Sequence, residues 1–233
     1  MFAIIKRELA AYFNSMIGTT FLFVYYLFSG IYFFYVLSYG TASLAPIFNN
    51  MFLVLILLIP ILTMRLFSEE RRNKTDQVFL TAPVNLWSVV LGKFLSAFFM
   101  LCLAMVINIT YGLVLSIFGN PDWMSIVSNL AGQLLLGAAL ISVGIFISSL
   151  TESQVIAAIS TFGISLLFVL LDSAASLVEF KWVSTAVSWI SFNQRYNEFT
   201  EGIINISSIV FFISAAVIFL FLTTRVLDKR RWN

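Results

Sequence analysis

Long apolar stretches, separated by short polar segments, make up most of the chain. A helix that spans a membrane needs about 20 predominantly apolar residues, and six stretches reach or approach that length. The pattern therefore predicts an all-α, polytopic integral membrane protein whose single transmembrane domain occupies residues 1–233. The six predicted transmembrane helices cover residues 16–39, 49–67, 86–118, 126–150, 154–172 and 203–226.

Residues 2–14 show the pattern of an amphipathic helix that lies in the inner membrane interface. Apolar side chains recur there at helical spacing, and polar side chains fall outside that stripe. The alternative is a frayed tail before the first span. The stripe contains Phe2, Ile5, Leu9, Tyr12 and Phe13, the residues outside it include Asn14, and we assign the charged residues Lys6, Arg7 and Glu8 to the interface.

Residues 180–202 are too polar to span a membrane and too apolar for a free loop. Their Trp and Tyr side chains favour the boundary between lipid and water. Because non-helical backbone at that depth must be covered by protein, we predict short re-entrant helices in the outer leaflet before the last span.

The composition excludes several classes of catalyst. The chain is 61% hydrophobic and only 10% charged, and no Lys, Arg, Asp or Glu occurs between Leu9 and Met64. Histidine is absent and Cys102 is the single cysteine, so we expect neither His-based chemistry nor a metal site. The phosphate-binding pattern G-x-x-x-x-G-K-[ST] is also absent. We therefore expect a protein that is not an enzyme, hydrolyses no ATP itself and holds no cofactor.

The basic residues predict the orientation of the chain in the membrane. With six spans and an inward N-terminus, 11 of the 13 Lys and Arg residues lie on the inner side, and Lys181 and Arg195 lie on the outer side. Cytoplasmic loops carry an excess of Lys and Arg. The sequence therefore predicts that both termini are cytoplasmic.

Charge is concentrated in one internal segment, "RLFSEERRNKTDQVFLTAP" at residues 65–83. Glu70 and Lys74 are four residues apart in the favourable order, which indicates a short cytoplasmic helix over 68–80 that ends at the "TAP" turn. The alternative is a loop that only anchors the topology. Both signs of charge are present beside an apolar flank, and this favours a docking surface for a soluble partner.

Few polar residues occur within the predicted spans. Lys93 is interpreted as an interfacial lysine that extends toward water. Asp172 and Arg195 are candidates for a pathway or an outer gate, whereas the alternative for Asp172 is a water-facing boundary residue. Small and polar residues, among them Asn108 and Ser148, are candidates for helix–helix contacts.

The run "TMRLFSEERRNKTDQVFLTAPVNLWSVVLGKFLSA" resembles the segment between the second and third spans of ABC-2-type transporter permeases. The matching positions are residues 65–71, Thr75, residues 80–83 and Gly92 with Lys93. The C-terminal run from Phe199 is similar to the family's last span. The closest similarity is to the branch linked to gliding motility and nitrous-oxide-reductase maturation. The sequence departs at Asn73-Lys74, where relatives often have a Gly before the Thr.

The resemblance implies the permease subunit of an ATP-driven transporter, usually an exporter, in a bacterial plasma membrane. It implies that ATP and Mg²⁺ are bound by a separate ATP-binding subunit and that a second permease copy or a paralogue completes a dimer. It also allows for an extracytoplasmic accessory protein, and it implies no nucleic acid. The charged segment would be the coupling helix, with coupling residues Arg65, Glu69, Glu70, Arg71, Arg72, Lys74, Thr75 and Asp76.

Two other functions stay open at this point. An ion-coupled carrier or channel would depend on Asp172, although such proteins usually need carboxylates near the membrane midplane. A membrane assembly scaffold that transports nothing would share the topology. The abundant Phe and Tyr of the first span fit an amphipathic substrate and lipid contact equally well.

Overall fold

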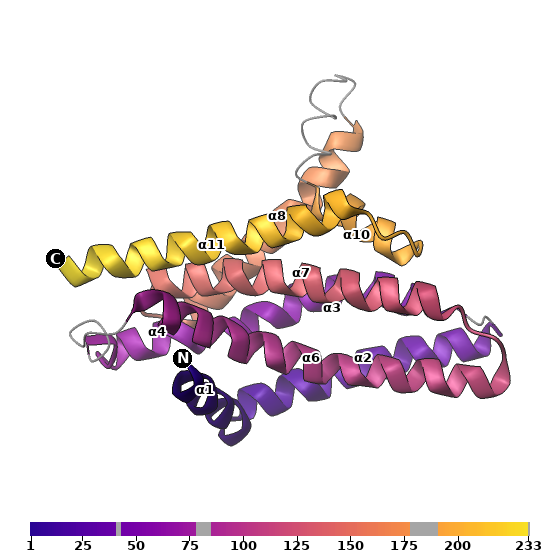
Figure 1. Ribbon diagram of the computed structural model, residues 1–233, viewed down its shortest axis with the longest axis horizontal. Helices are drawn as coiled ribbons and strands as arrows, with labels where there is room; N and C mark the ends of the chain where they lie inside the picture. Colours follow the sequence, from indigo (N-terminus) through magenta and orange to yellow (C-terminus); the bar gives the residue numbers. More distant parts are fainter. Residues whose placement is uncertain (41–42, 78–84, 178–190, 233) are drawn as a thin grey trace.

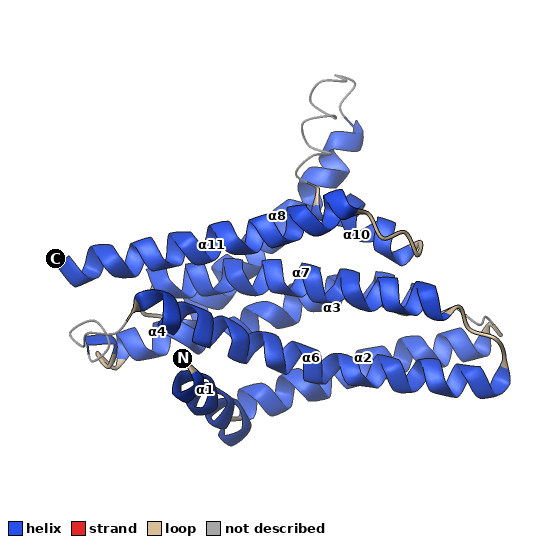
Figure 2. Cartoon of the chain, viewed as in Figure 1, coloured by secondary structure: helices blue, strands red, loops and turns tan. Residues whose placement is uncertain are grey.

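The computed structural model describes residues 1–40, 43–77, 85–177 and 191–232, without the side chains of residues 118, 171–177 and 232. Helices are the only regular secondary structure in these ranges (Figure 2). In chain order the helices are α1 (Phe2–Asn14), α2 (Met16–Ser38), α3 (Ala45–Thr63), α4 (Arg65–Arg72), α6 (Leu86–Phe118), α7 (Trp123–Leu150), α8 (Gln154–Leu177), α10 (Phe192–Thr200) and α11 (Ile206–Trp232).

Within the described ranges, five helical stretches are long and apolar enough to cross a membrane. They are Met16–Ser38, Ala45–Arg72, Leu86–Ile117, Trp123–Leu150 and Ile206–Arg231. The apolar part of α8, Gln154–Leu170, is shorter. The prediction of an all-helical, multi-pass membrane protein is thus confirmed, whereas the count of six spans stays a prediction.

Polar residues at the helix starts explain several boundaries. The side chains of Asn85, Asp122 and Ser191 accept hydrogen bonds from backbone N–H groups at the starts of α6, α7 and α10, at 2.9–3.0 Å. Such capping satisfies N–H groups that have no partner within the helix. The third and fourth spans therefore begin at or close to the predicted residues, and α10 lies within the predicted re-entrant region. Residues 180–190 of that region lie outside the described ranges.

The helices form a bundle with α7 at its centre. This helix packs against α3, α4, α6, α8, α10 and α11. Figure 1 shows α1, α4 and the C-terminal end of α11 toward the same end of the bundle, together with both termini. By contrast, α2 exposes large aromatic side chains such as Phe23 and Phe34, at 64% and 69% exposure, as expected for a helix in contact with lipid.

The central position of α7 depends on small residues at its crossings. A Cβ atom on Gly144 would lie 2.1 Å from Oγ1 of Thr63 and 2.8 Å from its Cβ. On Gly137 it would lie 2.1 Å from a methyl carbon of Leu101. Glycine at these positions lets α7 approach α3 and α6 closely, and close backbone approach is the usual basis of helix packing in membranes.

The structure corrects the predicted extent of the charged helix. The expectation was one helix over 68–80, but α4 starts at Arg65, directly after α3, and ends at Arg72. Residues 73–75 form a turn, and residues 78–84 lie outside the described ranges. The helix is therefore an extension of the second span beyond its apolar part, with one interruption at Met64.

We expect Gly144→Ala to lower the free energy of unfolding by about 1–3 kcal/mol, because the added methyl group overpacks the crossing with Thr63. The matched control is Gly163→Ala in α8, where a Cβ would meet no atom within 4 Å. The control should be neutral or stabilising by up to about 1 kcal/mol through helix propensity. Thermal unfolding of the purified protein in detergent measures both, and equal effects would contradict the tight crossing.

Candidate functional site

The junction between α3 and α4 is held by one side chain of α7. The backbone N–H groups of Phe67 and Ser68 each donate to Oγ of Ser148 at 3.1 Å. The same hydroxyl donates to the carbonyl oxygen of Met64 at 2.9 Å. Because a side chain that enters the i→i−4 hydrogen-bond series interrupts a helix, Ser148 both separates α4 from α3 and anchors it to α7.

Lys93 of α6 is the centre of a buried charged cluster. Its ammonium group donates to Oε1 of Glu8 at 2.9 Å and to the carbonyl oxygen of Leu66 at 2.6 Å. It also forms an ion pair with Oε2 of Glu70 at 2.9 Å, and it lies 5.0 Å from the ring centroid of Phe67. The interpretation of Lys93 as a lysine that extends toward water is wrong, since the residue is 0% exposed.

Arg7 completes this cluster on its solvent-exposed side. The Arg7 guanidinium donates to Oε1 of Glu8 at 2.7 Å and to Glu70. Burial alone would raise the pKa of Glu8, but the charge of Lys93 and the bonds from Arg7 outweigh it, so the pKa is lowered. Glu8 is therefore ionised at neutral pH. The four residues, Arg7, Glu8, Glu70 and Lys93, are called the Lys93 cluster below, and they join α1, α4 and α6.

Arg65 makes a second connection between α1 and the start of α4. Its Nη1 donates to Oγ of Ser15 at 2.7 Å and to the carbonyl oxygen of Ala11 at 3.3 Å. Its Nε pairs with Glu69 at 3.2 Å, one helical turn away. The buried hydroxyl of Tyr12 donates to the carbonyl oxygen of Leu62 at 2.8 Å. The N-terminal helix is thus bonded to both α3 and α4.

Two arginines satisfy the C-terminal end of α7. Arg71 donates from Nη1 to the carbonyl oxygen of Leu150 at 2.6 Å and pairs through Nε with Glu152 at 3.0 Å. Arg230 of α11 donates to the carbonyl oxygen of Ser149 at 2.5 Å. Cations at a helix C-terminus bond its last carbonyl groups and interact favourably with its dipole. Arg71 therefore connects α4 to the α7–α8 loop.

The remaining residues of the charged segment lie at the surface. Arg72, Lys74 and Thr75 are exposed, and Asp76 is half-buried. The backbone N–H of Thr75 donates to the carbonyl of Glu70 and that of Lys74 to the carbonyl of Arg71, at 2.9 and 3.1 Å. This is a Schellman motif with Lys74 at φ 56°. The helical pair expected between Glu70 and Lys74 is excluded, because the helix ends at Arg72.

The turn places Lys74 in a backbone conformation that favours glycine. The position that Lys74 occupies has a left-handed backbone, which only glycine adopts without steric cost. The turn is therefore built with a strained residue here.

The other predicted site residues are more dispersed. Lys6 is exposed on α1. Arg195 of α10 donates to Oγ of Ser207 at 3.1 Å and lies 4.6 Å from the ring centroid of Phe211. The backbone of Asp172 is part of α8, and its side chain lies outside the described part of the structure.

Three spans meet at a neutral polar centre that the sequence pattern did not predict. The amide of Asn108 (α6) donates to the hydroxyl of Tyr25 (α2) at 2.9 Å and to Oε1 of Gln133 (α7) at 3.3 Å. Tyr25 in turn donates to Gln133 at 3.3 Å. Asn108 was expected to contact another helix, but Tyr25 and Gln133 were not singled out. A Gln and a Tyr within apolar spans were the available signal.

A comparison with protein families agrees with this architecture. A family model described as "ABC-2 family transporter protein" matches residues 10–232, nearly the whole chain. No match is found among curated proteins. The matched range includes every transmembrane helix, the α3–α4 junction, and Glu70 and Lys93 of the cluster, and it begins shortly after Glu8.

We expect the Lys93 cluster to show strong coupling in a double-mutant cycle of Glu8→Gln and Lys93→Met. Removing one partner leaves the other charge buried, so each single change should lower the free energy of unfolding by up to about 3 kcal/mol. The double change should cost at least about 1 kcal/mol less than the sum of the two. Unfolding in detergent measures the cycle, and Lys6→Gln, an exposed change on the same helix, should stay within about 0.5 kcal/mol of wild type.

The same pair has a defined pH dependence. Because folding lowers the pKa of Glu8, its contribution is fully present above the ordinary glutamate pKa of about 4.3. That contribution is lost as the pH falls through the lowered value. The stability difference between wild type and Glu8→Gln should therefore be constant near neutral pH and disappear in acid. A difference that disappears at neutral pH would contradict the ionised pair.

We expect Lys74→Gly to raise the free energy of unfolding by about 0.5–1 kcal/mol, because glycine removes the steric cost at φ 56°. The control is Arg72→Gly, at the last helical residue, which should destabilise the protein by up to about 1 kcal/mol. Both are measured by thermal unfolding. Destabilisation by Lys74→Gly would contradict the strained turn.

Proposed function

The chain belongs to the ABC-2 transporter family and is therefore an ABC-transporter permease, and we propose that it is the membrane-spanning subunit of an ATP-driven exporter. Permeases of this family usually work with an ATP-binding subunit. In the proposal that subunit is a separate chain, which binds ATP and Mg²⁺ and docks on the segment formed by α4 and residues 73–77.

The observation that carries the proposal is the division of this segment into two faces. Arg72, Lys74 and Thr75 are exposed. Glu70 and Arg71 point back into the protein and bond α1, α6 and the α7–α8 loop. One face is thus free for a soluble partner while the other is bonded to the transmembrane helices. A segment that transmits motion from a docked subunit needs both.

The Lys93 cluster supports transmission of force rather than simple anchoring. Separating α4 from α6 would leave the buried ammonium of Lys93 without Glu70, and breaking a buried ion pair costs about 3–5 kcal/mol. Motion of α4 is therefore expected to carry α1 and α6 with it. Ser148 and Arg71 extend the same connection to α7. In the proposed cycle, ATP-driven closure of the partner subunits shifts these helices between inward- and outward-facing arrangements.

The path of the chain supports six transmembrane crossings. The end of α7 at Leu150 lies beside Arg71 and near Arg230. The hydroxyl of Ser128, near the start of α7, bonds the carbonyl of Phe199 in α10 at 3.1 Å. Between these points the chain runs through α8 and through residues 178–190, which lie outside the described ranges. The apolar part of α8, Gln154–Leu170, is about 26 Å long at 1.5 Å per residue, which is at the lower end of the length that spans a bilayer.

Six crossings place both termini on one side of the membrane, and the excess of basic residues favours the cytoplasmic side of a bacterial plasma membrane. In this orientation α1 lies in the inner interface. We further propose a dimer with a second permease copy or a paralogue, and an extracytoplasmic accessory protein would be compatible with it. Asp172 and Arg195 would then lie toward the outer side, as candidates for a gate.

The alternatives receive less support. An ion-coupled carrier needs an ionisable group near the midplane, whereas the polar centre of Tyr25, Asn108 and Gln133 is neutral. A scaffold that transports nothing would need the same docking segment, so it differs from the proposal only in the absence of a moved substrate. The polar centre and the exposed aromatic face of α2 are compatible with an amphipathic substrate.

The double charge reversal Arg72→Glu/Lys74→Glu tests the docking face. We expect co-purification of the ATP-binding subunit from the native host to fall at least about tenfold, because like charges are then brought together across the interface. Arg72→Lys/Lys74→Arg preserves the charge and should retain the subunit. Full co-purification with the reversed variant would contradict docking on this face.

A second variant separates docking from transmission. Glu70→Gln changes only the inward face, so the ATP-binding subunit should still co-purify. The ATPase rate of the complex should then equal that of the isolated subunit, because the permease no longer influences it. The outcome is read as ATP hydrolysis by the purified complex and by the isolated subunit. Loss of co-purification with Glu70→Gln would show that the two faces do not act separately.

A further inference from the structure

A cavity of about 320 Å³ lies between the start of α6 and the C-terminal part of α11. Its described lining includes Trp87, Phe221, Thr224, Arg225, Asp228 and Arg231. None of these residues belongs to the Lys93 cluster or to the docking face. The cavity therefore has no role in the function proposed above.

The lining combines two aromatic side chains with a charged rim. The rings of Trp87 and Phe221 lie 6.1 Å apart between centroids, and the guanidinium of Arg225 lies 5.0 Å from the centroid of Phe221. Stacking on an aromatic face fixes a guanidinium and leaves its edge N–H groups available. Arg231 adds a second cation, and Asp228 is the single acid among the described lining residues. The formal charges of the described lining residues thus sum to a positive value.

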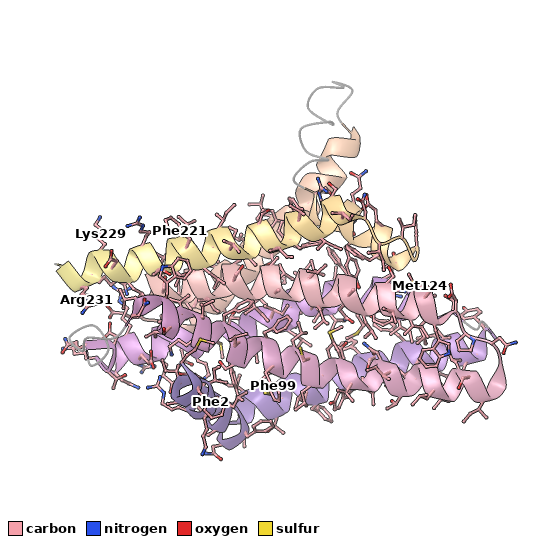
Figure 3. The ribbon with its side chains drawn as sticks, viewed as in Figure 1. Phe2, Phe99, Met124, Phe221, Lys229 and Arg231 are labelled. Carbon is pink, nitrogen blue, oxygen red and sulfur yellow. The ribbon has the colours of Figure 1, made fainter. Side chains whose placement is uncertain are left out.

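The position of the cavity along α11 sets its depth. The helix is apolar from Ile209 to Leu222 apart from Ser214, and its first charged residue is Arg225. The cavity therefore lies where the apolar part of the last span meets the membrane surface. Tryptophan favours this depth because its ring is amphipathic. Figure 3 shows Phe221 on α11, with Lys229 and Arg231 at the end of the helix on opposite edges in this view.

We propose that this cavity binds the headgroup of an anionic phospholipid from the leaflet at the α4 end of the bundle. Arg225 donates to the phosphate oxygens, since the guanidinium fork matches a phosphate, and Arg231 adds a positive charge to the rim. The rings of Trp87 and Phe221 pack against the glycerol and the first acyl carbons. Anionic lipids are preferred over zwitterionic lipids because the net charge of the rim is positive. The bound lipid joins α6 to α11.

Native mass spectrometry of the full-length protein in detergent tests this site. The probe is an equimolar mixture of phosphatidylglycerol and phosphatidylethanolamine with the same acyl chains. Wild type should retain phosphatidylglycerol preferentially. A basic residue near an anionic surface contributes about fivefold, so Arg225→Gln/Arg231→Gln should reduce that preference roughly 25-fold. The single change Arg225→Gln should reduce it about fivefold and replaces the double variant if that variant does not fold.

Two matched variants make the outcome specific. Lys229→Gln removes an exposed cation from the same end of α11 without touching the cavity, and it should leave the lipid preference unchanged. Asp228→Asn removes the acid and should strengthen the preference. Equal losses from Lys229→Gln and Arg225→Gln would overturn the proposal in favour of diffuse surface charge. Displacement of the lipid by excess inorganic phosphate would overturn it in favour of a simple anion site.

The test is independent of the proposed docking. Lipid preference is measured on the permease alone, so loss of the ATP-binding subunit cannot mimic a negative result. Thermal unfolding of each variant without added lipid confirms that it is folded. Retention of the preference in folded Arg225→Gln/Arg231→Gln would contradict the site while leaving the docking face unaffected.

Discussion

The buried ammonium of Lys93 is the constraint on which the arrangement of the surface helices depends. A cation that water cannot reach must be neutralised and hydrogen-bonded by protein groups. The partners of Lys93 come from α1 and α4. In sequence, Glu8 of α1 lies 85 residues before Lys93, and Leu66 and Glu70 of α4 lie 27 and 23 residues before it. Neither helix can leave α6 without exposing or stranding charge. A short amphipathic helix and an eight-residue helix, both too small to be stable alone, are thereby given fixed positions.

The second organising element is α7. Its glycines allow close approach to α3 and α6, and Ser148 takes the place of backbone partners at the α3–α4 junction. Arg71 and Arg230 satisfy its last carbonyl groups from two sides. Gln133 connects it to Tyr25 and Asn108 within the spans. One central helix therefore contacts both the charged end of the bundle and its neutral polar centre.

The spans could be predicted because hydropathy depends on consecutive residues. The starts of α2, α6 and α8 match the predicted boundaries, whereas α4 differs. Its interruption depends on Ser148, some 80 residues away, and its end depends on the backbone conformation of Lys74. Neither is visible in local spacing, so the helical pairing of Glu70 with Lys74 was a reasonable but wrong expectation.

The composition of the site was likewise only partly predictable. Arg65, Glu70 and Arg71 were assigned to the site from their segment, but their inward direction depends on contacts with α1, α6 and α7. Lys93 was visible as the only charged residue of the third span. Its depth was not, because a lysine near the end of a span can either reach water or be covered, and the covering residues come from distant segments. Tyr25 and Gln133 were overlooked for the same reason.

The succession of α3 and α4 on either side of one crossing has a mechanical consequence for the proposed function. The crossing of Thr63 with Gly144 lies between a long arm, Ala45–Thr63, and a short arm, Arg65–Arg72. At 1.5 Å per residue these arms measure about 28 Å and about 12 Å. If the two helices turned together about that crossing, the far end of α3 would move more than twice as far as the end of α4, because its arm is longer in that ratio. In the proposed cycle, a displacement of α4 by a few ångströms would then be enlarged at the far end of α3.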